Sequence, residues 1–173
     1  MILKSWLKRY LDSINFKSKK VLDVGCGKGK YSTLFNGGYI GIDKDTKKIK
    51  LAKSKYNASK FEVMDATKLR FKNNSFNLVF SIAVFHHLND NEIIKAFKEI
   101  YRVTAKGGNI LLVDLVLPKS IKFLAYPVFW FDKGAYIREF NRLSEMLSNE
   151  VNPRFTSLSR FLNLGVAVME WKK

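Results

Sequence analysis

The chain has 173 residues, 47% of them apolar, which is enough for one ordinary domain with a full core and too few for two. The single cysteine excludes an internal disulfide, no apolar run approaches the ~18 residues of a membrane span, and no signal peptide is evident. We therefore expect one domain over residues 1–173, in the cytoplasm and without a transmembrane segment, and the net charge of +16 needs an explanation.

The positive charge is concentrated at the beginning of the chain. Residues 1–60 hold fifteen of the 31 Lys and Arg residues and only four acids. Lysines outnumber arginines 24 to 7, whereas proteins that read nucleic acids favour arginine. The charge is consistent with a solvated basic face, and also with a surface for nucleic acid or for an acidic membrane.

Residues 1–19 predict an amphipathic helix followed by a basic linker. Apolar residues recur at three- and four-residue spacing between Ile2 and Leu11. We expect this helix to pack on the domain.

Residues 20–31, KVLDVGCGKGKY, predict a buried strand, Val21–Val24, that runs into a glycine loop. Glycines at 25, 27 and 29 allow a sharp turn and a close approach to a ligand. A helix over Tyr31–Asn36 is expected to follow, with its free N–H groups directed at the ligand. The spacing G-x-G-x-G differs from the dinucleotide fingerprint G-x-G-x-x-G, and Asp23 before it suits an ammonium group rather than a pyrophosphate.

This acid and three-glycine loop resembles the first motif of the class I (Rossmann-like) methyltransferases that depend on S-adenosylmethionine (SAM), of the methyltransferase-domain type 11/25. The resemblance implies that the loop binds SAM and that S-adenosylhomocysteine is the product. The residues that it assigns to cofactor binding here are Asp23, Gly25, Cys26, Gly27 and Gly29.

Two further acids follow predicted strands. Tyr39–Ile42 is a second strand that ends at Asp43, whose two carboxylate oxygens can accept both hydroxyls of a ribose, with Lys44 next to it. Asp45 and Thr46 are expected to cap a Lys-rich helix that reaches Tyr56 and whose lysines lie on the flank of the sheet, outside the pocket. Phe61–Met64 is a third strand, after which the resemblance places Asp65 and Ala66 against the adenine.

The fourth strand, Phe76–Ser81, leads into SIAVFHHL. Ligands of doubly wound sheets lie beyond the carboxyl ends of the strands, so Ser81, Ile82 and Ala83 are expected beside the glycine loop. His86 and His87 would then lie over the cavity, where imidazole is suited to proton transfer at neutral pH. For at least one of them, capping the next helix or packing is an alternative role.

The next elements are a helix that Asn89 or Asp90 caps, that reaches Val103 and that Gly107-Gly108 ends, and a fifth strand, Asn109–Val116, which carries Asp114. Strands and helices alternate, which predicts an α/β, doubly wound fold. With the resemblance, we expect a mostly parallel seven-stranded sheet with helices on both faces and an antiparallel last strand.

Residues 117–147 form an aromatic-rich region that predicts a lid or substrate wall, a hydrophobic helix on the core, or a peripheral contact with a membrane. Within it Asp132–Leu147 is expected to be helical, and Arg138 to bind an anionic substrate group or lie on the surface. Phe155–Leu158 and Val166–Trp171 are expected to be closing strands.

The implied reaction is methyl transfer from SAM to a small-molecule or lipid-like acceptor, with His86, His87 or Asp114 as a possible base and with no metal. One alternative is tRNA, because SIAVFHHL and the GKY after the glycine loop resemble the wobble-uridine carboxymethyl ester methyltransferases, although the basic residues are expected away from the pocket mouth. Another alternative is a SAM-binding regulatory protein without catalysis.

Overall fold

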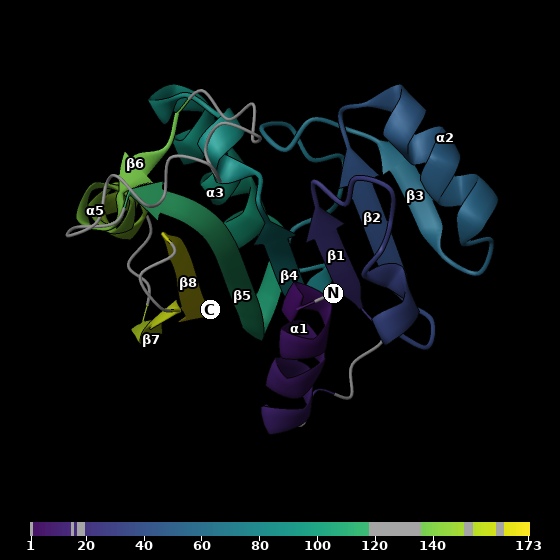
Figure 1. The fold of residues 1–173 in the computed structure, drawn as a ribbon, viewed down its shortest axis with the longest axis horizontal. Helices are drawn as coiled ribbons and strands as arrows, with labels where there is room; N and C mark the ends of the chain where they lie inside the picture. The colour runs from purple at the N-terminus through teal and green to yellow at the C-terminus, as the bar shows by residue number, and fades with distance from the viewer. Residues whose placement is uncertain (1, 15, 17–19, 118–135, 151–153, 162–164) are drawn as a thin grey trace.

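The computed structural model describes residues 2–14, 16, 20–117, 136–150, 154–161 and 165–173. A twisted sheet with the strand order β3-β2-β1-β4-β5-β8-β7 runs through the molecule, and a two-residue strand, β6, pairs with the end of β5 (Figure 1). The strands are β1 (Val21–Val24), β2 (Tyr39–Asp43), β3 (Lys60–Val63), β4 (Phe76–Ile82), β5 (Thr104–Leu117), β6 (Arg138–Glu139), β7 (Arg154–Phe161) and β8 (Val166–Lys172). The helices are α1 (Ile2–Ser13), α2 (Thr46–Lys55), α3 (Asp90–Val103) and α5 (Phe140–Glu150), with 3-10 turns η1 (Ser32–Leu34) and η2 (Phe85–His87).

Strand direction confirms the predicted fold class. Strands β1 to β5 are parallel, whereas β8, the last strand of the chain, is antiparallel to both of its neighbours, β5 and β7. The chain proceeds outward from β1 to β3 and then returns to place β4 on the other side of β1. This reversal of strand order puts the carboxyl ends of β1 and β4 side by side, where doubly wound sheets bind their ligands.

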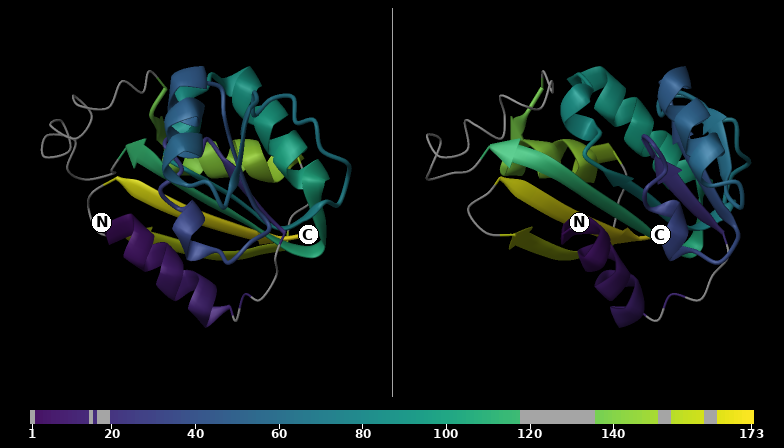
Figure 2. Two further views of the ribbon diagram at one scale, coloured as in Figure 1. Left: turned by 90° about the vertical axis from the view of Figure 1, so that its right-hand side faces the viewer. Right: turned by 45° about the vertical axis from the view of Figure 1, so that its right-hand side comes forward.

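Two hydrophobic cores lie on the two faces of the sheet, as the predicted helices on both faces require. One core joins Leu7 of α1 and Ile49 of α2 to the sheet residue Phe80. The other joins Phe97 of α3 and Leu147 of α5 to the sheet. Figure 2 shows α1 on one side of strands β5 and β8, with α3 and α5 on the other. Among the described helices, none combines the length and the apolar character that crossing a membrane requires.

Helix caps explain where two helices begin. The carboxylate of Asp45 accepts hydrogen bonds from the N–H groups of Lys47 and Lys48 at the start of α2. At the start of α3, Asn89 and Glu92 form a capping box, in which each side chain accepts a hydrogen bond from the backbone N–H of the other. Both starts agree with the sequence-based prediction.

One predicted helix and one predicted helix cap were wrong, although the predicted end of α3 at Val103 was right. The chain after the glycine loop forms only the 3-10 turn η1 and not a helix over Tyr31–Asn36, so no helix dipole of useful length faces the cavity. Helix α3 ends at Val103, and Gly107-Gly108 lies inside β5, where the pairing with β4 shifts register. Gly107 has φ +73°, and a Cβ on Gly108 would lie 2.8 Å from the carbonyl oxygen of Ala105, so this pair forms a bulge and not a helix cap.

The region after β5 is described only in part. The aromatic stretch of residues 118–131, expected to be a lid or substrate wall, lies outside the described residues, as do residues 132–135. From residue 138 the chain forms β6, and α5 begins at Phe140, later than predicted. The two closing strands are present and longer than predicted.

Candidate functional site

The glycine loop is tied to the end of β2 by backbone hydrogen bonds. The N–H groups of Gly25 and Cys26 both donate to the carbonyl oxygen of Ile42 at 2.8 Å. The next N–H, of Gly27, donates to Oδ2 of Asp43 at 2.9 Å. A Cβ at Gly25 would lie 2.2 Å from Cγ2 of Val84, so this position is closed to other residues. Gly27 has φ +56° and open space in front of it.

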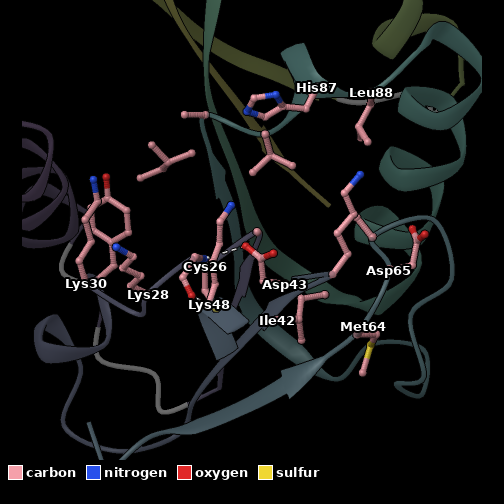
Figure 3. A pocket seen from close by; sticks show the side chains of 18 of the residues that line it. Cys26, Lys28, Lys30, Ile42, Asp43, Lys48, Met64, Asp65, His87 and Leu88 are labelled. Carbon is pink, nitrogen blue, oxygen red and sulfur yellow. Dashed lines mark hydrogen bonds between the residues drawn. The ribbon is translucent and has the colours of Figure 1, made fainter. Parts of the chain in front are cut away.

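A cavity of about 660 Å³ opens over the carboxyl ends of β1 to β4, a size typical of cofactor sites (Figure 3). Ten of the residues predicted to form the site line it. These are Gly25, Cys26, Gly27, Asp43, Lys44, Asp65, Ala66, Ile82, Ala83 and His87. The glycine loop, the two acids that follow strands and one of the two histidines therefore come together as expected.

Asp43 lies in the middle of this cavity and is fixed from two sides. Its Oδ2 accepts from Gly27 and its Oδ1 accepts from the N–H of Asp45 at 2.9 Å. The residue is 9% exposed and still lines the cavity. A carboxylate held in this way can accept further hydrogen bonds from the hydroxyls of a ribose.

Asp65 lies farther along the cavity, with Met64 and Ala66. Its Oδ1 accepts hydrogen bonds from the N–H and from the hydroxyl of Thr67, both at 2.7 Å. These bonds hold the pKa of the carboxyl group below its usual value. Asp65 is therefore an oriented anion at neutral pH.

The five other predicted site residues, Asp23, Gly29, Ser81, His86 and Asp114, lie outside the cavity wall formed by the described residues. Gly29 has φ +75°, and a Cβ there would lie 2.6 Å from the ring of Phe61. It thus serves the packing of the loop on the sheet. The hydroxyl of Ser81 donates to the carbonyl oxygen of Val24 at 2.9 Å and ties β4 to β1.

Asp23 is buried beneath the glycine loop. It is 1% exposed, and its Oδ2 accepts a hydrogen bond from the hydroxyl of Tyr39 at 2.6 Å. Burial raises the pKa of its carboxyl group to about 7, although the bond from Tyr39 acts in the opposite direction. Asp23 therefore lies behind the residues that line the cavity.

His86 and Asp114 form a buried pair instead of facing the cavity. Nδ1 of His86 is hydrogen bonded to Oδ1 of Asp114, and Oδ2 of Asp114 accepts from the N–H of Phe85. The two residues are 2% and 4% exposed. Of the three residues predicted as candidate bases, only His87, which is exposed, lines the cavity.

Several wall residues were missed by the sequence analysis. Four lysines line the cavity, and three of them, Lys28, Lys30 and Lys48, were not predicted to do so. Lys48 lies in the first turn of α2, close to the end of β2, so the expectation that the lysines of this helix stay outside the pocket was wrong. For Lys28 and Lys30, the available signal was the alternation of glycine and lysine over residues 27–30. The remaining additions are Leu3, Tyr31, Ile42, Met64, Val84, Leu88 and Glu92.

Arg138 has neither of its predicted roles. It is 9% exposed, and its guanidinium donates to Asp90 and to the carbonyl oxygens of Leu88 and Tyr136. It joins the strand β6 to the start of α3, at the cavity wall that Leu88 forms.

The sheet order and the cavity define a Rossmann-like α/β protein with a methyltransferase fold. A model of the methyltransferase domain family matches residues 22–112, and the chain belongs to this family. The domain is a SAM-dependent methyltransferase domain, with SAM as its cofactor.

Similar proteins show how far this likeness extends. The chain is 35% identical over 112 residues to tRNA (carboxymethyluridine(34)-5-O)-methyltransferase of Schizosaccharomyces pombe, an alignment that covers 62% of this chain and 47% of that protein. It is 26% identical over 149 residues to phosphoethanolamine N-methyltransferase 3 of Arabidopsis thaliana, covering 81% of this chain and 30% of that protein. The chain thus spans less than half of either relative. The PH0226 protein of Pyrococcus horikoshii shares the fold, with a TM-score of 0.78, 20% identity, and coverage of 98% of this chain and 87% of that one.

Proposed function

We propose that this enzyme transfers the methyl group of SAM to a small-molecule or lipid-like acceptor that carries an anionic group. The proposal rests on the basic wall of the cavity, to which Lys28, Lys44 and Lys48 contribute. Ammonium groups attract phosphate and carboxylate, so an acceptor with such a group would be held against this wall.

The acidic residues of the same wall already accept hydrogen bonds from other groups of the protein. Asp43 accepts from Gly27, Asp65 accepts from Thr67, and Glu92 accepts from the N–H of Asn89 at 2.8 Å. These bonds orient the carboxylates and stabilise their charge, so the carboxylates do not depend on ion pairs with the lysines. The lysines can then serve an anionic ligand.

For the cofactor, we infer that Asp43 accepts the ribose hydroxyls and that Asp65 and Ala66 meet the adenine. We place the amino-acid tail of SAM next to Gly25, Cys26 and Gly27, which line the cavity. Burial raises the pKa of the Cys26 thiol, so this thiol is neutral. SAM supplies a methyl group that is already activated on a sulfonium. The protein has mainly to align donor and acceptor, an effect that contributes about 7–11 kcal/mol in favourable cases.

His87 is the residue that we propose as general base. It lines the cavity beside Leu88 (Figure 3). An oxygen or nitrogen acceptor must lose a proton, and a neutral imidazole at the cavity wall can accept it.

The extent of the alignments supports a small acceptor. The match to phosphoethanolamine N-methyltransferase 3 covers 81% of this chain and extends well beyond the 62% covered by the match to the tRNA methyltransferase. Phosphoethanolamine also carries a phosphate. A direct test is an assay with methyl-labelled SAM and phosphoethanolamine, in which label is expected in a small product and inorganic phosphate is expected to inhibit.

The second candidate acceptor is tRNA. Two observations favour it: the similarity to the tRNA methyltransferase of Schizosaccharomyces pombe, and the lysines around the cavity. Label that appears in tRNA bearing carboxymethyluridine, and not in the small phosphate compound, would replace the first proposal by this one. Binding of tRNA would then weaken steeply with salt, because neutralised phosphates release counterions. A triple variant, K28Q/K44Q/K48Q, should flatten that slope, whereas K72Q/K95Q/K106Q, which removes the same charge from exposed lysines outside the wall, should not.

A further inference from the structure

Tyr31 presents an unexplained polar group at the cavity. The residue lines the cavity but is only 4% exposed. Its hydroxyl is buried, and within the described part of the chain no group forms a hydrogen bond with it. A buried hydroxyl without a partner costs free energy, so such groups in proteins generally meet a ligand or a water. Because Tyr31 lines the cavity, a ligand bound there is one such partner.

The position of Tyr31 along the cavity indicates which part of the cofactor it meets. Its sequence neighbour Lys30, with Lys28, lies at the end of the cavity opposite Met64 and Asp65, and Asp43 lies between the two ends (Figure 3). With the adenine at Asp65 and the ribose at Asp43, the rest of SAM extends toward Lys28 and Lys30. That remaining part is the amino-acid tail, which carries a carboxylate and an ammonium group.

The geometry points to Tyr31 as the residue that donates a hydrogen bond to the tail carboxylate of SAM, with the ammonium group of Lys30 beside it. Nζ of Lys30 lies 4.8 Å from the centroid of the Tyr31 ring. A hydroxyl donor and an ammonium group at the same end of a cavity form a site for a carboxylate. The inference depends on SAM as the cofactor and is independent of the acceptor.

Two features prepare Tyr31 for this contact. Its ring packs edge-on against Phe80 of β4, with ring centroids 6.0 Å apart, which limits movement of the hydroxyl. Burial, with the charge of Asp23 as a smaller cause, raises the pKa of Tyr31 to about 12, so the hydroxyl keeps its proton at neutral pH and can donate it.

Calorimetric binding of three ligands tests the inference without any methyl transfer. SAM has the whole tail, decarboxylated SAM lacks only the carboxylate, and methylthioadenosine lacks the amino-acid part. Because a hydrogen bond to a charged group contributes about 1.5–3 kcal/mol, Y31F should bind SAM about tenfold or more weakly. The affinities of Y31F for the two other ligands should equal those of the wild-type protein.

A second lysine and tyrosine pair provides matched controls. Nζ of Lys55 lies 5.4 Å from the ring centroid of Tyr56, outside the cavity wall, so Y56F and K55Q should bind SAM like the wild type. If Y31F does not fold, K30Q is used in its place. K30Q should weaken the binding of SAM but not that of decarboxylated SAM or methylthioadenosine. Unchanged SAM affinity in Y31F and K30Q, or an equal loss for all three ligands, would overturn the inference.

Discussion

Asp114 binds the imidazole of His86 and holds it inside the protein, while the adjacent His87 lies at the cavity. The two histidines therefore have different roles, although the sequence presents them as a pair. The turn η2, in which both lie, aims one side chain at β5 and the other at the cavity wall. The first role is structural, and the second is available for chemistry.

Substitution of His87 by alanine should lower the turnover number by about 10²–10⁴-fold, the usual contribution of a positioned general base. SAM binding should stay nearly unchanged, because the adenosine contacts lie elsewhere in the cavity. Single-turnover kinetics with a saturating acceptor, together with calorimetry for SAM, measure the two effects. Wild-type turnover in H87A would show that the acceptor needs no base from the protein.

His86→Ala should instead reduce the free energy of unfolding by about 3 kcal/mol, because it leaves the buried carboxylate of Asp114 without one of its partners. The backbone N–H groups of Phe85 and Leu115 still donate to this carboxylate, so the domain should fold. Urea denaturation provides the measurement. A stable H86A with greatly reduced turnover would contradict the structural role.

The pH dependence of stability should reveal Asp23. Its pKa is near 3.8 in the unfolded chain and is raised to about 7 in the fold by burial. Its contribution to stability is therefore complete below about pH 4 and is lost as the pH rises to about 7, with a total of roughly 4 kcal/mol. Other acids, such as Asp65, have lowered pKa values and act in the opposite direction, so the test is a difference between variants.

Asp23→Asn removes this titration and can still accept the bond from Tyr39. The stability of D23N relative to the wild type should increase between pH 4 and pH 7, as measured by denaturant midpoints across that range. The matched control is Asp12→Asn, which removes one carboxylate from an exposed position on α1. A flat difference for D23N would contradict the raised pKa.

The sequence predicted the sheet well because apolar strands and helix caps are local signals. Asp45 and Asn89 mark helix starts through bonds to residues two and three positions ahead. The bulge at Gly107-Gly108 was misread as a helix end, since a glycine with positive φ serves both purposes.

The site was predictable where backbone geometry decides it, as at Gly25 and Asp43. It was not predictable where side-chain direction decides. Whether Asp23 faces the cavity or Tyr39 depends on contacts between β1 and β2 that no local pattern encodes. The same is true of Tyr31, whose role depends on a hydroxyl left without a partner in the described structure.

Asp43→Asn should weaken SAM binding by about 10-fold to 100-fold, corresponding to the loss of one charged acceptor. An amide has one acceptor oxygen, so it cannot accept from Gly27 and Asp45 on two sides and from ribose hydroxyls as well. Calorimetry with S-adenosylhomocysteine and with adenine as a ligand without ribose separates the effects. Equal losses for both ligands would point to a distorted loop rather than to a lost ribose contact.

Arg138 and Arg142 share the carboxylate of Asp90, and this provides a comparison within one protein. Both guanidinium groups lie 2.6 Å from it, but the side chain of Arg138 is 8% exposed and that of Arg142 is 64% exposed. Their hydrogen bonds lower the pKa of Asp90, with Arg138 as the larger cause. Burial should make the first interaction far stronger than the second.

Arg138→Ala should therefore reduce the free energy of unfolding by about 3 kcal/mol, because Asp90 and two carbonyl oxygens lose a buried donor. Arg142→Ala should cost less than about 1 kcal/mol, as exposed ion pairs usually do. Double-mutant cycles with Asp90→Ala, measured by urea denaturation, isolate the two pairwise energies. Lysine at position 138 should not restore stability, because a single ammonium group cannot reach Asp90, Leu88 and Tyr136 with the geometry of a guanidinium. Equal coupling energies for the two arginines would show that the connection between β6 and α3 is maintained by apolar packing, and that the shared carboxylate contributes little to it.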